Sequence, residues 1–263
     1  MSKSIYQVFK NARAGARPTA AAYIEELFDK RIDLHGDRRF ADDTAIIGGI
    51  GYLGGIPTTY IGIEKGADLQ SRMAHNFGCP KPEGYRKALR LMKQAEKFRR
   101  PVVCFVDTMG AFCGVDAEER GQGEAIAENL VEMMGLQTPV ISVIIGEGGS
   151  GGALGLAVAD KVYMLENAVY SVIAPEGCAN ILWKDAQRVE EACEALHITA
   201  KDMLHFQVAE KIISEDFDHF DMMCENLKRE LVEDICHLSA VPKYDLLENR
   251  YHRYRAFGVY REE

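Results

Sequence analysis

The 263-residue chain has little of what marks membrane, zinc-binding or disulfide-bonded proteins. No apolar stretch approaches the roughly 20 residues needed to cross a bilayer, so we expect no membrane segment. The seven cysteines are odd in number, and no two have C-x-x-C spacing. That pattern argues against a disulfide framework and against a metal site on this chain. Free cysteines are typical of a reducing compartment, so we predict a cytoplasmic protein.

The sequence also lacks an excess of basic residues. It has 31 Lys and Arg against 40 Asp and Glu, which gives a formal net charge of −9. Nucleic acids and anionic membranes attract positive charge, so this balance argues against both as partners. Hydrophobic residues make up 47% and charged residues 27%, as in an ordinary globular protein, and the length allows a sizeable core.

The first half of the chain is predicted to mix helix and sheet. Residues 20–34 have the pattern of an amphipathic helix. Residues 48–64 alternate short apolar runs with Gly-Gly breaks, which predicts a β-hairpin with its turn at residues 53–56. A second helix is expected from Tyr85 onward, because apolar residues recur there at helical spacing.

Two similar units follow. Each begins with a short apolar run, at residues 101–106 and 139–145, and continues through a glycine-rich loop into a helical stretch. Strands that feed helices in this way indicate a layered α/β architecture. A third strand is predicted within residues 161–173, and after residue 185 the chain is expected to be helical.

No linker or low-complexity segment interrupts this pattern. We therefore predict a single domain over residues 1–263. Within it, residues 1–19 are expected to form an extended or flexible N-terminal segment.

The segment GEGGSGGA at residues 146–153 fits two known sequence motifs at once. Gly146, Gly148 and Gly151 match the dinucleotide fingerprint G-x-G-x-x-G, and the predicted strand before and helix after them suit that motif. Gly148, Ser150 and Gly152 match the nucleophile elbow G-x-S-x-G. That motif would also need an acid and a histidine from elsewhere in the chain.

A third interpretation of this segment uses the backbone itself. N–H groups in the first turn of a helix have no partner within the helix, and the helix dipole adds partial positive charge there. Glycines let a substrate oxygen approach closely, so these N–H groups could form an oxyanion hole. Alternatively, the glycines only permit tight packing of strand on helix, and the residues alone leave these two explanations open.

Longer segments resemble the α subunits of bacterial acetyl-CoA carboxylase carboxyltransferase, in their short form. They are LHGDRRFADDTAIIGG (34–49), NFGCPKPEGYRKALRLMKQAEKF (76–98), VDAEERGQGEAIAENL (115–130), IGEGGSGGALGLAVADKVYMLENAVYSVIAPEGCANILWKDA (145–186) and ENRYHRY (248–254). The likeness begins near Arg17 and continues nearly to the C-terminus. It implies the family's α/β crotonase-like (ClpP/crotonase) fold of repeated ββα units, with a helical C-terminal region.

The resemblance also implies an activity and partners. The reaction moves a carboxyl group from carboxybiotin, delivered on the biotin carboxyl carrier protein, to acetyl-CoA, which gives malonyl-CoA for fatty acid biosynthesis. The family assembles as an α2β2 heterotetramer with its active site between α and β subunits, and it works with biotin carboxylase in an ATP-dependent complex. The zinc and most contacts to CoA are expected on the β subunit.

The resemblance assigns a role to the glycines of GEGGSGGA. The N–H groups of Gly151 and Gly152 are expected to form the oxyanion hole for biotin. Gly148 and Gly149 are expected beside them, on the carboxybiotin side of the site. No side-chain nucleophile is required for this chemistry.

A second loop, DTMGAFCG at residues 107–114, is expected to complete the site. Gly110 and Ala111 would form the opposite wall. The family usually reads DTPGAYPG here, so this chain lacks two prolines and a tyrosine but keeps both glycines. Lys65 could meet an anionic substrate group, although a surface position is the expected one. The alternative functions are a paralogous acyl-CoA carboxyltransferase subunit and a serine hydrolase that uses Ser150.

Overall fold

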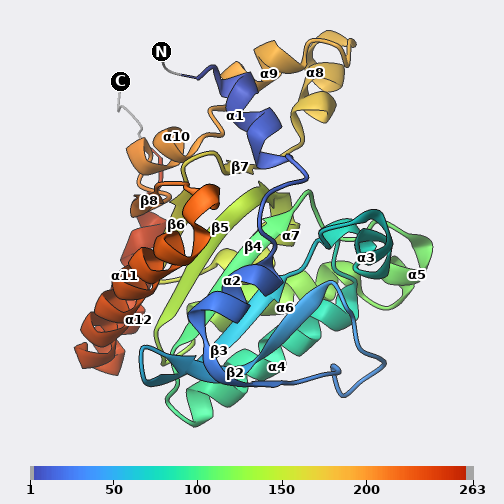
Figure 1. The fold of residues 1–263 in the computed structure, drawn as a ribbon. Helices are drawn as coiled ribbons and strands as arrows, with labels where there is room; N and C mark the ends of the chain where they lie inside the picture. The colour runs from blue at the N-terminus through green and yellow to red at the C-terminus, as the bar shows by residue number, and fades with distance from the viewer. Residues whose placement is uncertain (1–2, 259–263) are drawn as a thin grey trace, which may run out of the picture.

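A single twisted sheet organises the molecule, as the computed structural model of residues 3–258 shows (Figure 1). The strand order is β1-β2-β3-β4-β5-β6-β8, and β7 pairs with β5 beside this path. The strands are β1 (Asp29–Asp33), β2 (Ile46–Leu53), β3 (Ile56–Ile63), β4 (Val102–Thr108), β5 (Val140–Gly149), β6 (Lys161–Leu165), β7 (Val169–Ser171) and β8 (Lys211–Ile213).

Helices cover both faces of this sheet. α4, α6 and α7 pack on one face, and α2 and α11 pack on the other (Figure 1). The helices are α1 (Ile5–Ala12), α2 (Ala20–Leu27), α3 (Leu69–Ala74), α4 (Pro82–Lys97), α5 (Val115–Glu119), α6 (Gln122–Met134), α7 (Ser150–Ala157), α8 (Pro175–Trp183), α9 (Val189–Leu196), α10 (Ala200–His205), α11 (Phe220–Ala240) and α12 (Lys243–Arg255), with short 3₁₀ turns at Asn76–Gly78 and Phe217–His219.

The central strands explain the continuous apolar runs of the sequence. β3, β4, β5 and β6 are parallel to one another, and every residue of β4 is buried. Parallel strands with helices on both faces bury both sets of side chains, so they carry apolar runs in place of alternation. Because β3, β4 and β5 run the same way, their carboxyl ends meet at one edge, where ligands bind in open α/β sheets.

Several predicted elements are confirmed. The hairpin forms from β2 and β3, with Gly54 and Gly55 at positive φ in its two-residue turn. The helix predicted from Tyr85 is α4, which begins slightly earlier at Pro82, a residue that suits the first position of a helix. The two apolar runs are β4 and β5.

Two predictions about helical regions are wrong. Residues 20–34 form α2 only as far as Leu27, and residues 29–33 then pair antiparallel with β2 as an edge strand. Likewise, residues 211–213 lie in the region expected to be helical but form β8 beside β6. Both are short sheet edges whose conformation depends on pairing with another strand, β2 for β1 and the more distant β6 for β8, so local periodicity does not reveal them.

The expectation of an extended or flexible segment over residues 1–19 is also wrong for residues 5–12, which form α1. Ser4 caps this helix by accepting a hydrogen bond from the Gln7 N–H. Val8 and Phe9 are buried in a small apolar cluster with residues of β7 and α9. The helix is therefore held by tertiary packing, while residues 1–2 lie outside the described part of the chain.

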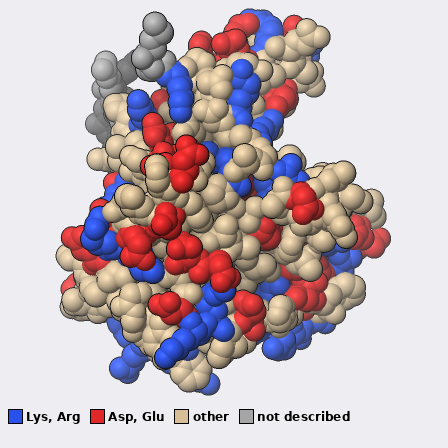
Figure 2. All heavy atoms as spheres, in the orientation of Figure 1, with Lys and Arg blue, Asp and Glu red and all other residues tan. Residues whose placement is uncertain are grey.

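Three further observations concern what the described residues contain. No helix within residues 3–258 is long and apolar enough to span a bilayer. In the same part of the chain, no group of three or more His, Cys, Asp or Glu side chains is placed to hold a metal ion. Basic and acidic side chains are interspersed over the face seen in Figure 2.

Candidate active site

The segment GEGGSGGA joins β5 to α7 without an intervening loop. β5 continues through Gly149, four residues beyond the predicted strand, and α7 begins at Ser150. Ser150 has a φ of 51°, which is uncommon for a residue other than glycine and turns the chain sharply into the helix. Gly151 and Gly152 thus lie in the first turn of α7, where N–H groups lack acceptors within the helix.

The DTMGAFCG loop has its own tight turn after β4. The Thr108 hydroxyl accepts a hydrogen bond from the Gly110 N–H at 3.0 Å and donates one to the Gly110 carbonyl at 2.8 Å. Gly110 has a φ of 154°, a backbone conformation that side-chain-bearing residues rarely adopt. The glycine is therefore needed for its backbone angle, since nothing lies within 4 Å of where its Cβ would be.

The two glycine segments pack backbone against backbone. A Cβ on Gly149 would lie 2.3 Å from the Met109 carbonyl oxygen, and one on Gly152 would lie 2.5 Å from the Ala111 nitrogen. The structure thus brings Gly110 and Ala111 into direct backbone contact with Gly152. Their catalytic role remains a prediction.

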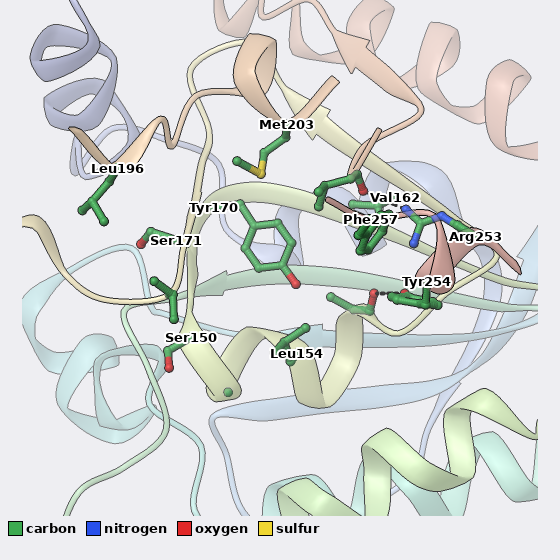
Figure 3. A pocket seen from close by; sticks show the side chains of 14 residues that line it. Ser150, Leu154, Val162, Tyr170, Ser171, Leu196, Met203, Arg253, Tyr254 and Phe257 are labelled. Carbon is green, nitrogen blue, oxygen red and sulfur yellow. Dashed lines mark hydrogen bonds between the residues drawn. The ribbon is translucent and has the colours of Figure 1, made fainter. Parts of the chain in front are cut away.

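Gly151 differs from its neighbours because its surroundings are open. The nearest heavy atom to a Cβ at this position would be the Ile126 Cγ2 atom, at 3.8 Å. Gly151 also lines a cavity of about 350 Å³ (Figure 3). The backbone of Gly151 is therefore accessible to a ligand, whereas that of Gly152 is buried.

The cavity beside Gly151 is mainly apolar. Leu154 and Met203 contribute aliphatic and thioether surface to it (Figure 3). Tyr170 lines it as well, and burial raises the pKa of this phenol, which is therefore neutral. Arg253, also in the lining, donates a 2.7 Å hydrogen bond to Glu210. The cavity suits the apolar body of a small ligand.

Tyr85 fixes the first turn of α7 from the neighbouring helix α4. Its hydroxyl donates a 3.0 Å hydrogen bond to the Gly152 carbonyl, and its ring lies against Gly155. Asn129 of α6 donates to the Gly155 carbonyl at 2.9 Å. Sequence periodicity placed Tyr85 on an apolar face but missed this role. A buried tyrosine usually needs a hydrogen-bond partner for its hydroxyl, so a tyrosine on the apolar face of a helix was the sequence signal for such a contact.

A cluster of charged side chains lies beneath the two glycine segments. Lys65, which follows β3, donates to Asp107 of β4 at 3.2 Å and to Glu147 of β5 at 2.9 Å. Arg13 donates to Glu147 at 2.6 Å and also binds Glu176 of α8. The expectation that Lys65 lies on the surface is therefore wrong, because the strand order carries it to the edge where three strands end.

The ionisation of this cluster follows from burial and pairing. Burial raises the pKa of Asp107 above its usual value, although Lys65 opposes that effect. Burial would also raise the pKa of Glu147, but Lys65 and Arg13 together hold it below its usual value. Burial alone would lower the pKa of Lys65, and the two carboxylates raise it instead.

The structure favours neither the nucleophile elbow nor the dinucleotide fingerprint. Among the described residues, no histidine lines the cavity or makes a hydrogen bond with Ser150, so a hydrolase triad is not assembled. The dinucleotide fingerprint normally follows the first strand of its domain along the chain, whereas four strands of the same sheet precede β5 here. The backbone interpretation is the one that the geometry fits.

Comparison with known proteins agrees with the resemblance seen in the sequence. A family model described as acetyl co-enzyme A carboxylase carboxyltransferase-like matches residues 2–258. The acetyl-coenzyme A carboxylase carboxyl transferase subunit alpha of Clostridium perfringens is 57% identical over 250 residues, which are 94% of this chain and 92% of that protein. Its counterpart from Streptococcus uberis is 56% identical over 253 residues, 96% of this chain and 99% of the other.

Solved structures confirm the predicted fold class. Transcarboxylase 12S superposes with a TM-score of 0.70 at 17% identity, over 96% of this chain but only 46% of its own. A Pseudomonas malonate decarboxylase heterotetramer superposes with a TM-score of 0.67 at 14% identity, and the match covers 83% of this chain and 89% of the matched chain. Such low identities establish the fold alone, which is the carboxyltransferase, crotonase-like fold.

Proposed function

This chain belongs to the family of acetyl-CoA carboxylase carboxyltransferase α subunits, and from that premise we propose that it transfers the carboxyl group of carboxybiotin to acetyl-CoA to form malonyl-CoA. The observation that supports this most directly is the arrangement of the two glycine segments. They place an accessible helix N-terminus at Gly151 beside an apolar cavity. Fatty acid biosynthesis would consume the product.

The residues present suit a biotin ring. Its ureido oxygen needs hydrogen-bond donors when negative charge develops on it. The N–H group of Gly151, which is accessible, would be the first donor, and that of Gly152, which is buried beside Ala111, would be the second. The open space at Gly151 admits an oxygen close to the backbone, and the apolar cavity beside it suits the rest of the ring system. Carboxybiotin would supply the carboxyl group, and no nucleophile from this chain is required.

Each remaining part of the site has a supporting role in this proposal. Gly148 and Gly149 lead β5 up to the donors, and Gly110 and Ala111 hold the first turn of α7 from the other side. Tyr85 fixes the Gly152 carbonyl and thereby the direction of the adjacent peptide groups. Preorganised donors of this kind stabilise developing charge without reorganising during the reaction.

The proposal includes partners. Donors for the acetyl oxygen, most contacts to CoA and a zinc site would come from a β subunit in an α2β2 heterotetramer. Exposed apolar side chains near the DTMGAFCG loop, such as Met109 and Val115, are suited to contact another subunit. The biotin carboxyl carrier protein would deliver carboxybiotin, and biotin carboxylase would recharge it in the cytoplasm at the expense of ATP.

Reconstitution tests this proposal. The purified chain alone should form no malonyl-CoA from carboxybiotin and acetyl-CoA, and adding a zinc-ribbon β subunit should produce activity, because each subunit holds one of the two oxyanion sites. Malonyl-CoA is measured directly, with the β subunit alone as the control. Activity of the isolated chain, or none from a co-purified complex, would contradict the proposal.

A further inference from the structure

Three charged groups lie at the carboxyl ends of three neighbouring parallel strands. The Lys65 ammonium touches both Asp107 and Glu147, whose side chains are only 7% and 6% exposed. Burying charges is costly even when they are paired, and such clusters are weak evidence for a stabilising role. Buried ionisable groups beside a candidate site are therefore candidates for a functional role.

Asp107 and Glu147 meet at an irregularity in the sheet. One residue of β4, Asp107, faces three residues of β5, which makes a bulge at residues 145–147. The flanking pairs are Val106↔Ile144 and Thr108↔Gly148. Bulges next to active sites re-aim the strand that carries them. Here the bulge sets the direction in which β5 runs on to Gly149 and α7.

Side chains hold this bulge on the side of β4, and Glu147 also pairs with Val169 of β7. The Glu147 N–H donates to the Asp107 Oδ1 atom at 2.9 Å, and the Ile145 carbonyl accepts from Arg17 at 2.7 Å. A Cβ on Gly146 would lie 2.5 Å from the Asp107 Oδ1 atom. The first glycine of GEGGSGGA therefore makes room for the Asp107 carboxylate.

We infer that Lys65 is a positioning residue for carboxyl transfer. By neutralising Asp107 and Glu147 together, it holds the bulge of β5 in place and thereby sets the distance between Gly152 and the Gly110 turn. This inference rests on the proposed function, because the geometry that Lys65 maintains is that of the oxyanion donors.

Removing the Lys65 charge leaves two buried carboxylates side by side. Arg13 binds Glu147 but makes no hydrogen bond to Asp107, so the repulsion is relieved only if Asp107 takes up a proton. Lower pH favours that proton, so a variant without the lysine should recover part of its lost activity as the pH falls. The other charged or titratable groups around the cluster are Arg13 of α1, Tyr23 of α2, Cys79 after the Asn76–Gly78 turn, Glu176 of α8, and the paired Arg17 and Glu215 at the Ile145 carbonyl.

The test compares Lys65→Met with Lys65→Arg in the complex with the β subunit. For Lys65→Met we expect kcat for malonyl-CoA formation to fall roughly ten- to hundredfold, as for a small misplacement of catalytic groups. The KM for acetyl-CoA should not change. The loss of kcat relative to wild type should become smaller as the pH is lowered. Lys65→Arg keeps the charge and should retain most of the activity.

Two further variants distinguish the effect of the Lys65 charge on activity from a general effect on folding. Lys93→Met removes a half-exposed lysine of α4 that also contacts two carboxylates, Glu96 and Glu132, and should behave as wild type. The double variant Lys65→Met/Asp107→Asn removes the repulsion but keeps an oxygen for the Glu147 N–H. It should therefore be more active than Lys65→Met, even if the single variant is poorly folded.

Hydrogen exchange provides a readout that does not depend on activity. The amides of residues 145–152 should exchange faster in Lys65→Met than in wild type or in Lys93→Met. Wild-type kcat in Lys65→Met, or a loss that neither pH nor the arginine variant relieves, would overturn the inference. An inactive wild-type complex would instead count against the proposed function, and the exchange experiment would still decide the role of Lys65.

Discussion

Glycines in this protein serve three different physical purposes, which only their surroundings distinguish. Gly149 and Gly152 leave room for the backbone of the facing loop. Gly110 adopts a backbone angle that other residues avoid. Gly151 has open space around it, so the absence of a side chain there leaves its backbone accessible to a ligand. A substitution should therefore have a different consequence at each position.

Gly151→Val should abolish carboxyl transfer while leaving the fold largely intact. The new side chain would occupy the space through which a substrate oxygen reaches the N–H groups, and losing one such donor typically costs about 10²- to 10³-fold in rate. Little else is disturbed, because the nearest atom to the new Cβ is 3.8 Å away. The measurement is malonyl-CoA formation in the complex, together with a thermal unfolding curve.

Gly135→Val provides the matched control for this substitution. Gly135 ends α6 in an exposed position, and the nearest atom to its Cβ would be the Glu132 carbonyl oxygen at 3.7 Å. The valine there should leave turnover unchanged. Turnover of the Gly151 variant close to that of wild type would show that the oxyanion site lies elsewhere.

At the scale of elements, α1 connects the N-terminus to the candidate site. Phe9 is buried in the cluster that α1 forms with β7 and α9, and the Arg13 guanidinium lies 4.0 Å from the centre of its ring. Arg13 in turn binds Glu147 of the bulged strand. The packing of α1 therefore helps to hold Arg13 in its contact with Glu147, within the charge cluster beneath the glycine segments.

Phe9→Ala should release α1 from the molecule. Truncating a buried phenylalanine typically costs about 3–5 kcal/mol, which a helix of eight residues cannot recover from its own propensity. We expect faster hydrogen exchange in residues 5–12 and cleavage by trypsin at Lys10 or Arg13. Phe217→Ala, which removes a ring near Arg17 outside this cluster, serves as the comparison. Unchanged protection of α1 would show that its docking depends on other contacts.

At the scale of the whole molecule, Arg250 connects the last helix to the core. Its side chain is fully buried and makes two 2.8 Å hydrogen bonds to Asp160. It also donates to the carbonyls of Met133 and Leu136, at the end of α6. One side chain thus connects α12 to segments that lie 90 or more residues away in sequence.

Arg250→Met should destabilise the whole chain. Removing one partner of a buried ion pair leaves the Asp160 charge uncompensated, and such changes typically cost about 3–5 kcal/mol. The free energy of unfolding in urea measures this loss. Arg255→Met, at the exposed end of the same helix, should leave that free energy unchanged. A similar stability for both variants would mean that water replaces the arginine at Asp160.

Local pattern was sufficient for the elements that form from adjacent residues. The β2–β3 hairpin was predicted from its Gly-Gly turn, and α4 from its apolar spacing, because both depend on contacts between near neighbours. The edge strands β1 and β8 and the helix α1 were missed for the opposite reason. Their conformations depend on tertiary partners outside their own segments, and those partners outweigh local preference.

The sequence by itself determined the family, the α/β class and the two glycine segments, because these depend on residue identity and on short-range order. Only the tertiary structure decided which backbone groups face each other and which lysine pairs with the two buried carboxylates. Gly151 and Gly152 are adjacent in sequence, yet one is open and the other lies against Ala111. Lys65 became part of the site because three parallel strands end at one edge, a contact that strand order creates and no local pattern contains.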